Sequence, residues 1–475
     1  MKVKERMLIS RQKPVEVQVE KRVDNFNEVI KGFTESSAII EAQRCLQCKK
    51  PLCVEGCPLA NDIPGFIKLL EERKFEEAYW RVSDHSAMSA ICSRVCPHEF
   101  QCEGACVRGK GGGEPVAIGL LERFVVDWMR KSGKNMFKEC PKPIGKRVAI
   151  IGSGPASMSV AYYLSHAGIM STVFEAKNVI GGMLTLGIPP FRLPRQVIDD
   201  EFENLINCGV QIKTGVMVGR DISLDQLKTA GYDTVFLGVG AHASKKLGLE
   251  HELDTEGVIH GIDYLRRVFS GEKIALGKRV VVVGGGNVAI DVARTALREG
   301  AEDVMIIYRR TRKEMPACES EILHLEEEGI RIEFLTSPVE LIRDDAGRLM
   351  GIECQRMELG EPDESGRRRP VVMDGYNFKL KVDTLIPAIS QIVEHTAIHG
   401  KRFKMTSWGT YETNPETLQT SVGWVFAGGD DVLGPQTIAK AVYQGRVAAE
   451  SIYLFLKGQD PSLNREHLCQ LPNRL

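Results

Sequence analysis

The sequence predicts a multidomain protein of mixed α and α/β class, in which a helical N-terminal domain precedes two interleaved Rossmann-like dinucleotide-binding domains. Three observations predict this fold. Eight of the thirteen cysteines lie between Cys45 and Cys106, in a region whose apolar residues have helical spacing. Two glycine-rich turns, at Gly152 and Gly284, each follow an apolar strand and open a helix. With 475 residues, the chain is also too long for a single core.

The cysteines form two strings, which read Cys45-x2-Cys48-x4-Cys53-x3-Cys57-Pro58 and Cys92-x3-Cys96-Pro97-x4-Cys102-x3-Cys106. Closely spaced thiolates followed by Cys-Pro are typical of loops that wrap a cubane iron–sulfur cluster, because soft sulfur ligands must reach several iron atoms from one short segment. The sequence therefore predicts a helical iron–sulfur domain, with helical patterns at residues 63–79 and 118–129.

Three other roles are open to cysteines. A disulfide scaffold requires an oxidising compartment, but the chain opens MKVKERMLISRQ, without an apolar segment for secretion. Zinc stays an alternative, although only Cys45 and Cys48 are spaced as Cys-x2-Cys and no His-x3-His follows. Cys208, Cys318 and Cys354 are interpreted as isolated core residues, because cysteine often packs as a small hydrophobe.

Charge and hydropathy exclude several partner classes. The net charge is −1, from 62 basic and 63 acidic residues, which gives no bulk attraction to nucleic acid or to an anionic membrane. No apolar run approaches the roughly twenty residues of a membrane helix, and no targeting segment is recognisable. We therefore expect a cytoplasmic protein with neither a nucleic-acid partner nor a membrane span.

The sequence pattern changes after a predicted linker. The segment 131–146 is rich in glycine and proline, so the iron–sulfur domain is predicted to comprise residues 1–145. Short apolar strands, glycine turns and helices follow. Residues 146–272 and 386–475 are assigned to the first dinucleotide domain, and residues 273–385 to the second.

The first glycine turn predicts a dinucleotide site. Gly152 makes the tight turn after the strand, and Gly154 lets backbone N–H groups approach a pyrophosphate. Ser157 replaces the third glycine of the fingerprint. Glu175 ends the next strand, where a carboxylate accepts hydrogen bonds from ribose hydroxyls.

The second turn predicts an NADPH site. Its fingerprint residues are Gly284, Gly286, Asn287 and Ala289. The next strand ends in a basic run where an NAD site would carry an acid, and a guanidinium can bind a 2′-phosphate with two hydrogen bonds. The predicted phosphate ligands are Arg309, Arg310 and Arg312. A solvated basic turn is the alternative.

A third glycine turn lies near the C-terminus. Gly429 and Asp430 follow an apolar strand, and an alanine-rich helix is predicted to begin near Thr437. An acid at such a turn can bind a ribityl hydroxyl, and a helix N-terminus favours negative charge on a reduced flavin ring. The first site is therefore predicted to bind FAD. A purely structural strand–turn–helix unit is the alternative.

Over essentially its full length, the chain resembles the small (beta) subunit of NADPH-dependent glutamate synthase and its relatives. The relatives include the large subunit of NADH-dependent ferredoxin:NADP oxidoreductase and the N-terminal half of dihydropyrimidine dehydrogenase. The matching segments are Arg44–Cys48, Gly56–Pro58, Asp62–Ile67, Arg94–Pro97, Cys102–Cys106, Gly113–Gly119, Gly187–Pro194, Tyr308–Pro316 and Ala427–Asp430.

The resemblance implies how the cysteines divide between two [4Fe–4S] clusters. One cluster takes Cys45, Cys48, Cys53 and Cys106. The other takes Cys57, Cys96, Cys102 and a non-cysteine ligand, Glu122, which leaves Cys92 as a non-ligand. The cysteine count alone does not establish this division, because eight cysteines also fit two clusters in which every ligand is a cysteine. The resemblance also implies that the segment Gly181–Pro194, with Gly182, Met183 and Arg192, lines the flavin.

Two segments depart from the family pattern. Residues 84–88 read Asp-His-Ser-Ala-Met where a Thr-Asn-Pro-Leu-Pro-like turn is usual, and residues 388–391 read Ala-Ile-Ser-Gln instead of Ala-Ile-Gly-Gln. These changes bear on the flavin potential and on partner docking, while the cofactor set is unaffected.

The implied function is electron transfer from NADPH through FAD and the clusters to a partner subunit, within a hetero-oligomer. A flavin is needed because nicotinamide gives two electrons and a cubane accepts one. The predicted partner is the large glutamate synthase subunit. The alternative is a ferredoxin-reductase-like flavoprotein in a bifurcating complex. Thioredoxin reductase-like chemistry is disfavoured because no Cys-x2-Cys occurs in the second dinucleotide domain. A cluster-binding sensor does not explain two nucleotide sites.

Overall fold

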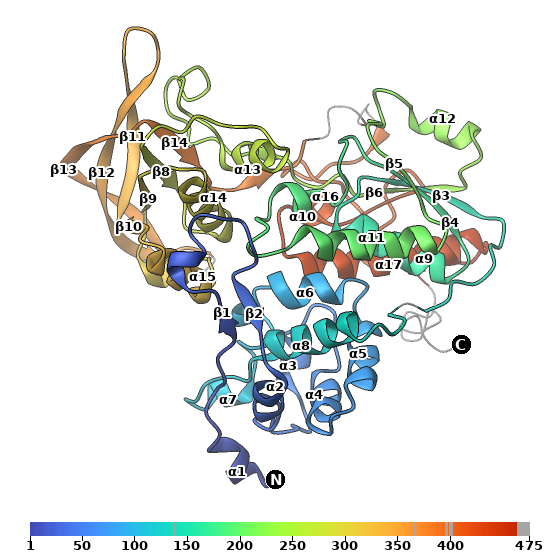
Figure 1. Ribbon diagram of the computed structural model, residues 1–475. Coiled ribbons are helices and arrows are strands. Elements are labelled where there is room, and N and C mark those ends of the chain that lie inside the picture. Colours follow the sequence, from blue (N-terminus) through green and yellow to red (C-terminus); the bar gives the residue numbers. More distant parts are fainter. Residues whose placement is uncertain (137, 365, 395–397, 399–401, 463–475) are drawn as a thin grey trace.

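The computed structural model describes residues 1–462 except 137, 365, 395–397 and 399–401. A helical N-terminal domain, coloured blue to cyan in Figure 1, lies beneath two α/β domains. Green and red segments share one of these α/β domains, because the chain returns to it after it has built the other. None of the described helices is both long and apolar enough to cross a membrane.

The N-terminal domain is a set of short helices connected by the cysteine loops. Helix α4 begins after Asp62, whose carboxylate accepts a hydrogen bond from the Gly65 N–H at 3.1 Å. The predicted helical pattern over 63–79 is divided into α4 and α5, because the chain turns at Arg73, which has a φ of 60°. The elements are α1 (Val3–Met7), β1 (Val15–Glu16), η1 (Val19–Lys21), β2 (Ile30–Gly32), α2 (Glu35–Ala42), α3 (Leu52–Glu55), α4 (Ile63–Glu71), α5 (Phe75–Ser83), α6 (Ser89–Val95), η2 (His98–Phe100), α7 (Val107–Lys110) and α8 (Ile118–Lys131).

The first α/β domain contains a parallel five-stranded sheet in the order β16-β6-β3-β4-β5. Helix α17, from the C-terminal segment, packs against α9, which follows the first glycine turn. The elements are β3 (Arg147–Ile151), α9 (Pro155–His166), β4 (Met170–Phe174), α10 (Met183–Leu186), α11 (Arg195–Asn207), β5 (Gln211–Lys213), α12 (Leu224–Thr229), β6 (Thr234–Leu237), β7 (Ala243–Ser244), β15 (Gln391–Ile392), β16 (Val425–Ala427), α16 (Asp430–Leu433) and α17 (Ile438–Leu456).

The second α/β domain contains a parallel sheet in the order β10-β9-β8-β14. One face of this sheet packs against helices, and the other packs against the antiparallel sheet β11-β12-β13. The elements are α13 (Gly261–Phe269), β8 (Arg279–Val283), α14 (Asn287–Arg298), β9 (Asp303–Tyr308), η3 (Arg312–Glu314), α15 (Glu319–Glu327), β10 (Arg331–Phe334), β11 (Thr336–Arg343), β12 (Leu349–Pro362), β13 (Arg368–Lys381) and β14 (Thr384–Pro387).

The hydrophobic cores cross the predicted domain limits at two places. One continuous core spans the N-terminal domain and the helical side of the first α/β domain, so the linker after α8 separates two units that share a core. Helix α13 precedes the predicted limit at residue 272, yet its Tyr264 and Leu265 belong to the core of the second α/β domain. The limits of the three domains stay predictions.

Three cysteines are interpreted as isolated core residues, and the structure agrees for two of them. Cys318 and Cys354 are buried core residues. The interpretation of Cys208 as an isolated core residue is wrong, because this cysteine forms a disulfide with Cys140. No sequence pattern indicates this pair, since the two positions are separated by 68 residues and meet only in the folded chain.

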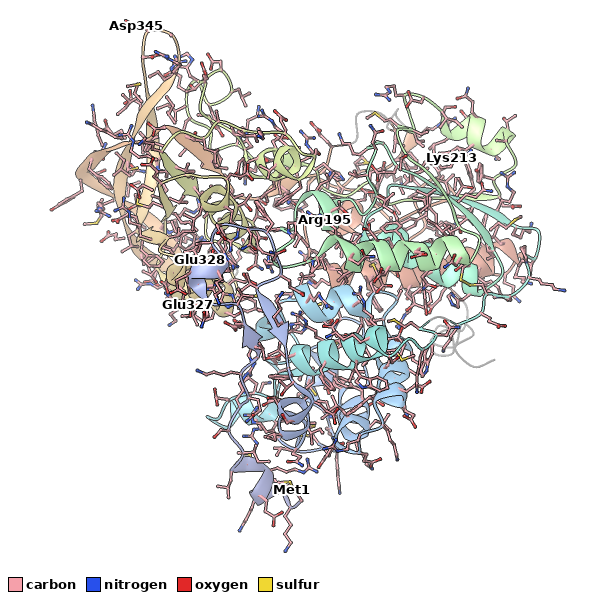
Figure 2. The ribbon with its side chains drawn as sticks, in the orientation of Figure 1. Met1, Arg195, Lys213, Glu327, Glu328 and Asp345 are labelled. Carbon is pink, nitrogen blue, oxygen red and sulfur yellow. A yellow bond between two sulfur atoms is a disulfide. The ribbon has the colours of Figure 1, made fainter. Side chains whose placement is uncertain are left out.

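A buried ion network fastens the N-terminal arm to the second α/β domain. The Glu328 carboxylate accepts hydrogen bonds from Arg22 at 3.1 Å, from Arg294 at 2.8 Å and from Arg298 at 2.7 Å. Burial opposes ionisation, but the guanidiniums of Arg298 and Arg294 lower the pKa of Glu328 to about 2. Figure 2 shows Glu327 and Glu328 beside a blue segment of the N-terminal arm, well above Met1.

We expect Glu328→Gln to lower the free energy of unfolding by about 3–5 kcal/mol, because three guanidiniums lose the charge that compensates their burial. Unfolding in urea would measure the loss. Glu326→Gln is the matched control. Its partner Arg312 lies at the surface, so we expect a loss below about 1 kcal/mol. Equal losses in the two variants would contradict a special role for the buried network.

Candidate flavin, nucleotide and iron–sulfur sites

A large cavity opens at the carboxyl ends of the first parallel sheet. Its volume of about 840 Å³ is within the range of sites for large organic ligands. Nine of the ten residues predicted to bind FAD line it: Gly152, Gly154, Glu175, Gly182, Met183, Arg192, Gly429, Asp430 and Thr437. The tenth, Ser157, is fully buried and lies outside the lining residues.

The first glycine turn is shaped by a close backbone approach. Gly152 has a φ of +92°, and a Cβ atom there would lie 2.4 Å from the Gly238 carbonyl oxygen. Ser157, in the following helix, donates a hydrogen bond from its hydroxyl to the same carbonyl at 3.5 Å. Ser157 therefore packs the helix against the strand, which is the task of the third glycine in the fingerprint.

Glu175 is held in place at the end of β4. One of its carboxylate oxygens accepts from the Ser153 N–H at 3.0 Å and from the Ser153 hydroxyl at 2.6 Å. The other accepts from the Lys177 N–H at 2.8 Å. Sequence reasoning missed Ser153, which lies inside the glycine turn and orients the acid. A carboxylate fixed in this way fits the hydroxyls of a ribose.

The C-terminal turn brings an acid and a helix end to the same cavity. The Asp430 carboxylate accepts from the Gln436 N–H at 3.1 Å, and burial raises the pKa of Asp430 to about 6. Helix α17 begins after Thr437, so its unpaired N–H groups lie at the cavity. An acid and a helix N-terminus at one end of the cavity fit the ribityl chain and ring of a flavin.

A second cavity, of about 510 Å³, lies at the carboxyl ends of β8 and β9. Gly284, Gly286 and Asn287 line it, whereas Ala289 is buried beneath the turn. The two cavities share lining residues, which are Ser244, Lys246, Ile262, Asn287, Val288, Ser390 and Gln391. Ligands bound in the two cavities would therefore meet at this boundary, which includes the departure from the family pattern at Ser390.

The three predicted phosphate ligands have different surroundings. Arg309 lines the second cavity and is exposed, and no hydrogen bond from its side chain occurs within the described part of the chain. Arg310 also lines the cavity, but it donates to the Arg368 carbonyl at 2.7 Å and pairs with Asp363 at 2.8 Å. Arg312 lies outside the lining residues, where two glutamates of α15 bind it.

Asp291 is a site residue that sequence reasoning missed. It lies on α14, and one of its oxygens pairs with Arg192 at 2.7 Å. The other oxygen is buried, accepts no hydrogen bond from the described residues, and belongs to a residue that lines the first cavity. Burial raises the pKa of Asp291 to about 6. An unsatisfied buried acceptor on a residue that lines the first cavity fits a ligand that donates an N–H group.

The N-terminal cysteines gather in two groups. Cys45, Cys48, Cys53 and Cys106 line one small cavity. In the other group, the buried Glu122 carboxyl interacts electrostatically with the thiols of Cys57, Cys96 and Cys102. Burial raises the pKa of Glu122 to about 8. Cys92 forms a hydrogen bond with Cys96, so it also lies beside this second group.

The spacing of the sulfur atoms bears on the choice between zinc and a cluster. A tetrahedral zinc ion needs sulfur ligands about 3.8 Å apart, given a Zn–S length of about 2.3 Å. Among the described residues, no three N-terminal cysteines have all their sulfur atoms within 4.8 Å of one another. The wider spacing fits a cluster that holds several irons better than it fits a single ion.

The second cysteine group adjoins the first cavity, which is the candidate flavin cavity because the predicted FAD residues line it. Val95 and Pro97, which flank Cys96, line that cavity. The Gln101 side chain also donates to the Thr437 hydroxyl at 3.2 Å, across the boundary between the domains. Gln101 and Thr437 are 336 residues apart in the sequence. Only the fold reveals that a cysteine loop and the start of α17 meet.

Comparison with known proteins agrees with this arrangement. Residues 22–134 match the family described as dihydropyrimidine dehydrogenase domain II, 4Fe-4S cluster. Residues 146–445 match the pyridine nucleotide-disulphide oxidoreductases. The chain belongs to the pyridine nucleotide-disulphide oxidoreductase family. This oxidoreductase therefore combines a dinucleotide-binding unit with a 4Fe-4S domain, as the sequence predicts.

Several curated proteins are similar to this oxidoreductase. It is 42% identical to the NADP(+)-dependent formate dehydrogenase subunit beta of Moorella thermoacetica, over 85% of this chain and 60% of that protein. It is 40% identical to the NADPH-Fe(3+) oxidoreductase subunit beta of Geobacter sulfurreducens, over 88% and 65%. It is 36% identical to the glutamate synthase [NADPH] small chain of Escherichia coli, over 91% and 94%. It thus spans less than two thirds of the first two relatives.

A solved structure shows the same fold. Mycobacterium tuberculosis FprA in complex with NADPH superposes with a TM-score of 0.56 at 19% identity, over 67% of this chain and 85% of FprA. The predicted fold class and the resemblance to glutamate synthase small chains and their relatives are confirmed. The prediction of an oxidoreductase that uses FAD, NADPH and a 4Fe-4S domain is also confirmed. The number of clusters and the individual ligands stay predictions.

Proposed function

We propose that this chain takes electrons from NADPH and passes them, through FAD and two [4Fe–4S] clusters, to a partner subunit. The observation that carries the proposal is the continuity of three sites. The nucleotide cavity shares lining residues with the flavin cavity, and the flavin cavity is lined by both neighbours of Cys96. A bound flavin would convert the two-electron chemistry of nicotinamide to one-electron transfer.

The protein's residues have distinct tasks in this proposal. Arg309 and Arg310 hold the 2′-phosphate of NADPH, which selects it over NADH. Asp291 accepts an N–H from the nicotinamide carboxamide, while its pairing with Arg192 fixes its position. Glu175 and Asp430 hold the flavin through its hydroxyls. The start of α17 offers N–H groups to negative charge that develops on the flavin ring.

The clusters would be held by the two cysteine groups. Cys45, Cys48, Cys53 and Cys106 hold one, and Cys57, Cys96, Cys102 and Glu122 hold the other. The second group adjoins the flavin cavity, which supports its place as the first acceptor. Cys48 and Cys53, in the first group, are partly exposed, and neither that group's cysteines nor their neighbours in sequence line the flavin cavity, which supports an exit for electrons at that end of the domain.

The first candidate partner is a glutamate synthase large subunit. The chain is 36% identical to the Escherichia coli glutamate synthase small chain, over 91% of this chain and 94% of that protein. Higher identity to the beta subunits from Moorella and Geobacter favours a second candidate, an electron-transfer subunit of another NADP-linked complex. Both candidates use the same internal electron path and differ in what docks near the exit.

Anaerobic titration of the purified protein with NADPH tests the path. We expect the flavin absorption near about 450 nm to bleach and cluster signals to appear in the EPR spectrum. Bleaching with NADH but not with NADPH would contradict the assignment of the arginines. Addition of glutamine, 2-oxoglutarate and a glutamate synthase large subunit should then give glutamate only if the first partner is correct.

A further inference from the structure

A disulfide joins the interdomain linker to the flavin domain at a place that the proposed electron path does not use. Cys140 lies on the linker between α8 and β3, and Cys208 directly follows α11. Their Cα atoms are 5.5 Å apart, a separation that a disulfide accommodates without backbone movement. Both cysteines are half-buried, so the sulfur atoms lie near the protein surface.

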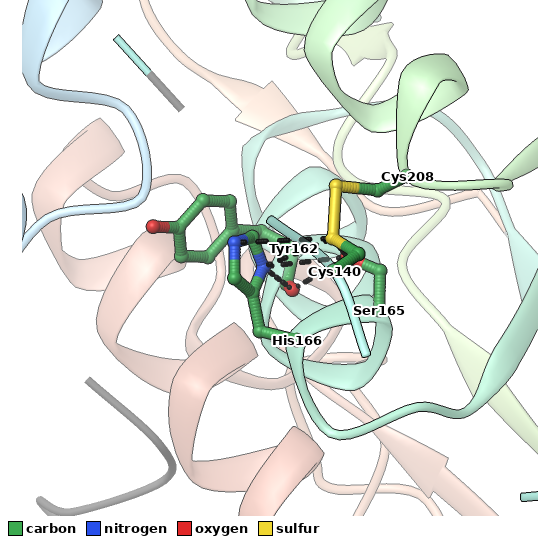
Figure 3. The surroundings of a disulfide bond; sticks show 5 residues. All are labelled: Cys140, Tyr162, Ser165, His166 and Cys208. Atoms are coloured by element: carbon green, nitrogen blue, oxygen red, sulfur yellow. Dashed lines mark hydrogen bonds between the residues drawn. A yellow bond between two sulfur atoms is a disulfide. The ribbon is translucent and has the colours of Figure 1, made fainter. Parts of the chain in front are cut away.

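A histidine side chain lies against this sulfur pair, as Figure 3 shows. His166 ends α9, and its Nδ1 lies 2.9 Å from the Tyr162 carbonyl oxygen. Because a carbonyl can only accept, Nδ1 carries the proton and Nε2 keeps its lone pair. Both ring nitrogens lie 4.0 Å from the Cys140 sulfur, and Nε2 is the one whose lone pair is free to accept a proton. Burial lowers the pKa of His166, which keeps the ring neutral and able to accept a proton.

The surroundings hold these groups together from three separate segments. The ring of Tyr162 lies against His166, with centroids 4.4 Å apart. The Ser165 hydroxyl lies 3.9 Å from the Cys140 sulfur. Hydrogen bonds also hold the linker on either side of Cys140. The Tyr79 hydroxyl donates to the Met136 carbonyl at 2.8 Å, and the Ile144 N–H donates to the Gly168 carbonyl at 2.8 Å. These contacts hold the linker at Cys140 against the flavin domain independently of the disulfide.

We propose that Cys140 and Cys208 form a reversible thiol–disulfide exchange site for low-molecular-weight disulfides, with His166 as the proton acceptor for Cys140. His166 Nε2 takes the thiol proton, and the Cys140 thiolate attacks a disulfide RSSR to give a mixed disulfide and RS⁻. The Cys208 sulfur then attacks Cys140 Sγ, which releases a second RS⁻. Each RS⁻ takes one of the two protons lost by the protein, so two protein thiols and RSSR become one protein disulfide and two RSH.

A metal site is the competing interpretation of the same residues. The Cys140, Cys208 and His166 donor atoms lie within 4.8 Å of one another, and they are the one such group among the described residues. A structural zinc site takes four protein ligands, however, and this group offers three. In the structure the two sulfurs are also bonded to each other. Both observations favour thiol exchange.

Peptide mapping of the intact, cofactor-loaded protein tests the proposal. The protein is reduced with dithiothreitol, freed of it without oxygen, and then incubated with or without oxidised glutathione. Accessible thiols are blocked with N-ethylmaleimide before digestion. We expect both Cys140 and Cys208 to be blocked without oxidised glutathione, and to be linked to each other, about 2 Da lighter as a pair, after its addition. Cys318 and Cys354, which are buried, serve as internal controls that stay unblocked in both samples.

Two variants test the assigned steps. Cys208→Ser cannot complete the second attack, so we expect Cys140 to remain as a stable mixed disulfide with glutathione. His166→Gln keeps a polar side chain but loses the proton acceptor. We expect disulfide formation to slow by about tenfold or more, with the same final product. A histidine with only a structural role would leave that rate unchanged.

Several results would overturn the proposal. One is a Cys140–Cys208 bond that resists dithiothreitol in the folded protein, since the bond would then be permanent. Another is that N-ethylmaleimide still reacts with both thiols after incubation with oxidised glutathione, since no disulfide has then formed. A third is one zinc ion per reduced chain that is lost in Cys208→Ser, because the site would then bind metal. None of these measurements depends on the proposed electron path.

Discussion

Cys96→Ala is expected to remove one of the two proposed clusters while it leaves the proposed flavin site intact. The iron content should fall from about eight to about four atoms per chain, because a cubane holds four irons and a neighbouring cluster has its own ligands. NADPH should still bleach the flavin. Electron delivery to a partner should fall by about 100-fold or more, because Cys96 lies between Val95 and Pro97, which line the flavin cavity. Iron analysis and EPR would measure the first effect, and acceptor reduction the second.

Two matched variants separate the ligands from their neighbours. Cys92 forms a hydrogen bond with Cys96 and is buried, but it is not a predicted ligand, so Cys92→Ala should retain about eight irons. Glu122→Gln should lose iron or shift the potential of the affected cluster, because a neutral amide replaces the predicted carboxylate ligand. If Cys92→Ala loses four irons and Glu122→Gln loses none, Cys92 is the fourth ligand and the resemblance misled us.

Arg309→Ala is expected to remove most of the preference for NADPH over NADH. A charge-assisted hydrogen bond contributes about 1.5–3 kcal/mol, which corresponds to about 10- to 150-fold in kcat/KM for NADPH. NADH lacks the 2′-phosphate, so its kcat/KM should change by less than about twofold. Steady-state reduction of ferricyanide with each nucleotide would measure both values. Equal losses with the two nucleotides would show that Arg309 supports the cavity rather than the phosphate.

Arg312→Ala distinguishes the sequence pattern from the structure. The basic run predicts all three arginines as phosphate ligands, whereas Arg312 pairs with Glu319 at 2.7 Å and with Glu326 at 2.5 Å, outside the cavity lining. From the structure we expect its kcat/KM for NADPH to stay within about threefold of the parent, because surface ion pairs contribute little. A loss as large as that of Arg309→Ala would favour the sequence interpretation.

The sequence was most informative where function depends on the backbone or on residue type at short range. Gly152 must adopt a positive φ beside the Gly238 carbonyl, so its glycine was a reliable signal. The cysteine strings were equally direct, since cluster loops need soft ligands close together in sequence. Most of the predicted flavin residues accordingly line one cavity, and the comparisons confirm the predicted kinds of cofactor, while the number of clusters stays a prediction.

Local sequence patterns were enough to predict the class of fold, the order of the domains and the kinds of cofactor, because each of these depends on residues close together in the chain. The tertiary structure alone decided which residues from distant segments meet. It placed Asp291 beside Arg192 in the lining of the first cavity, directed Arg312 to α15, and joined Cys140 to Cys208. Such contacts arise from the packing of elements far apart in the chain, and no short-range pattern of hydrophobicity or glycine encodes them.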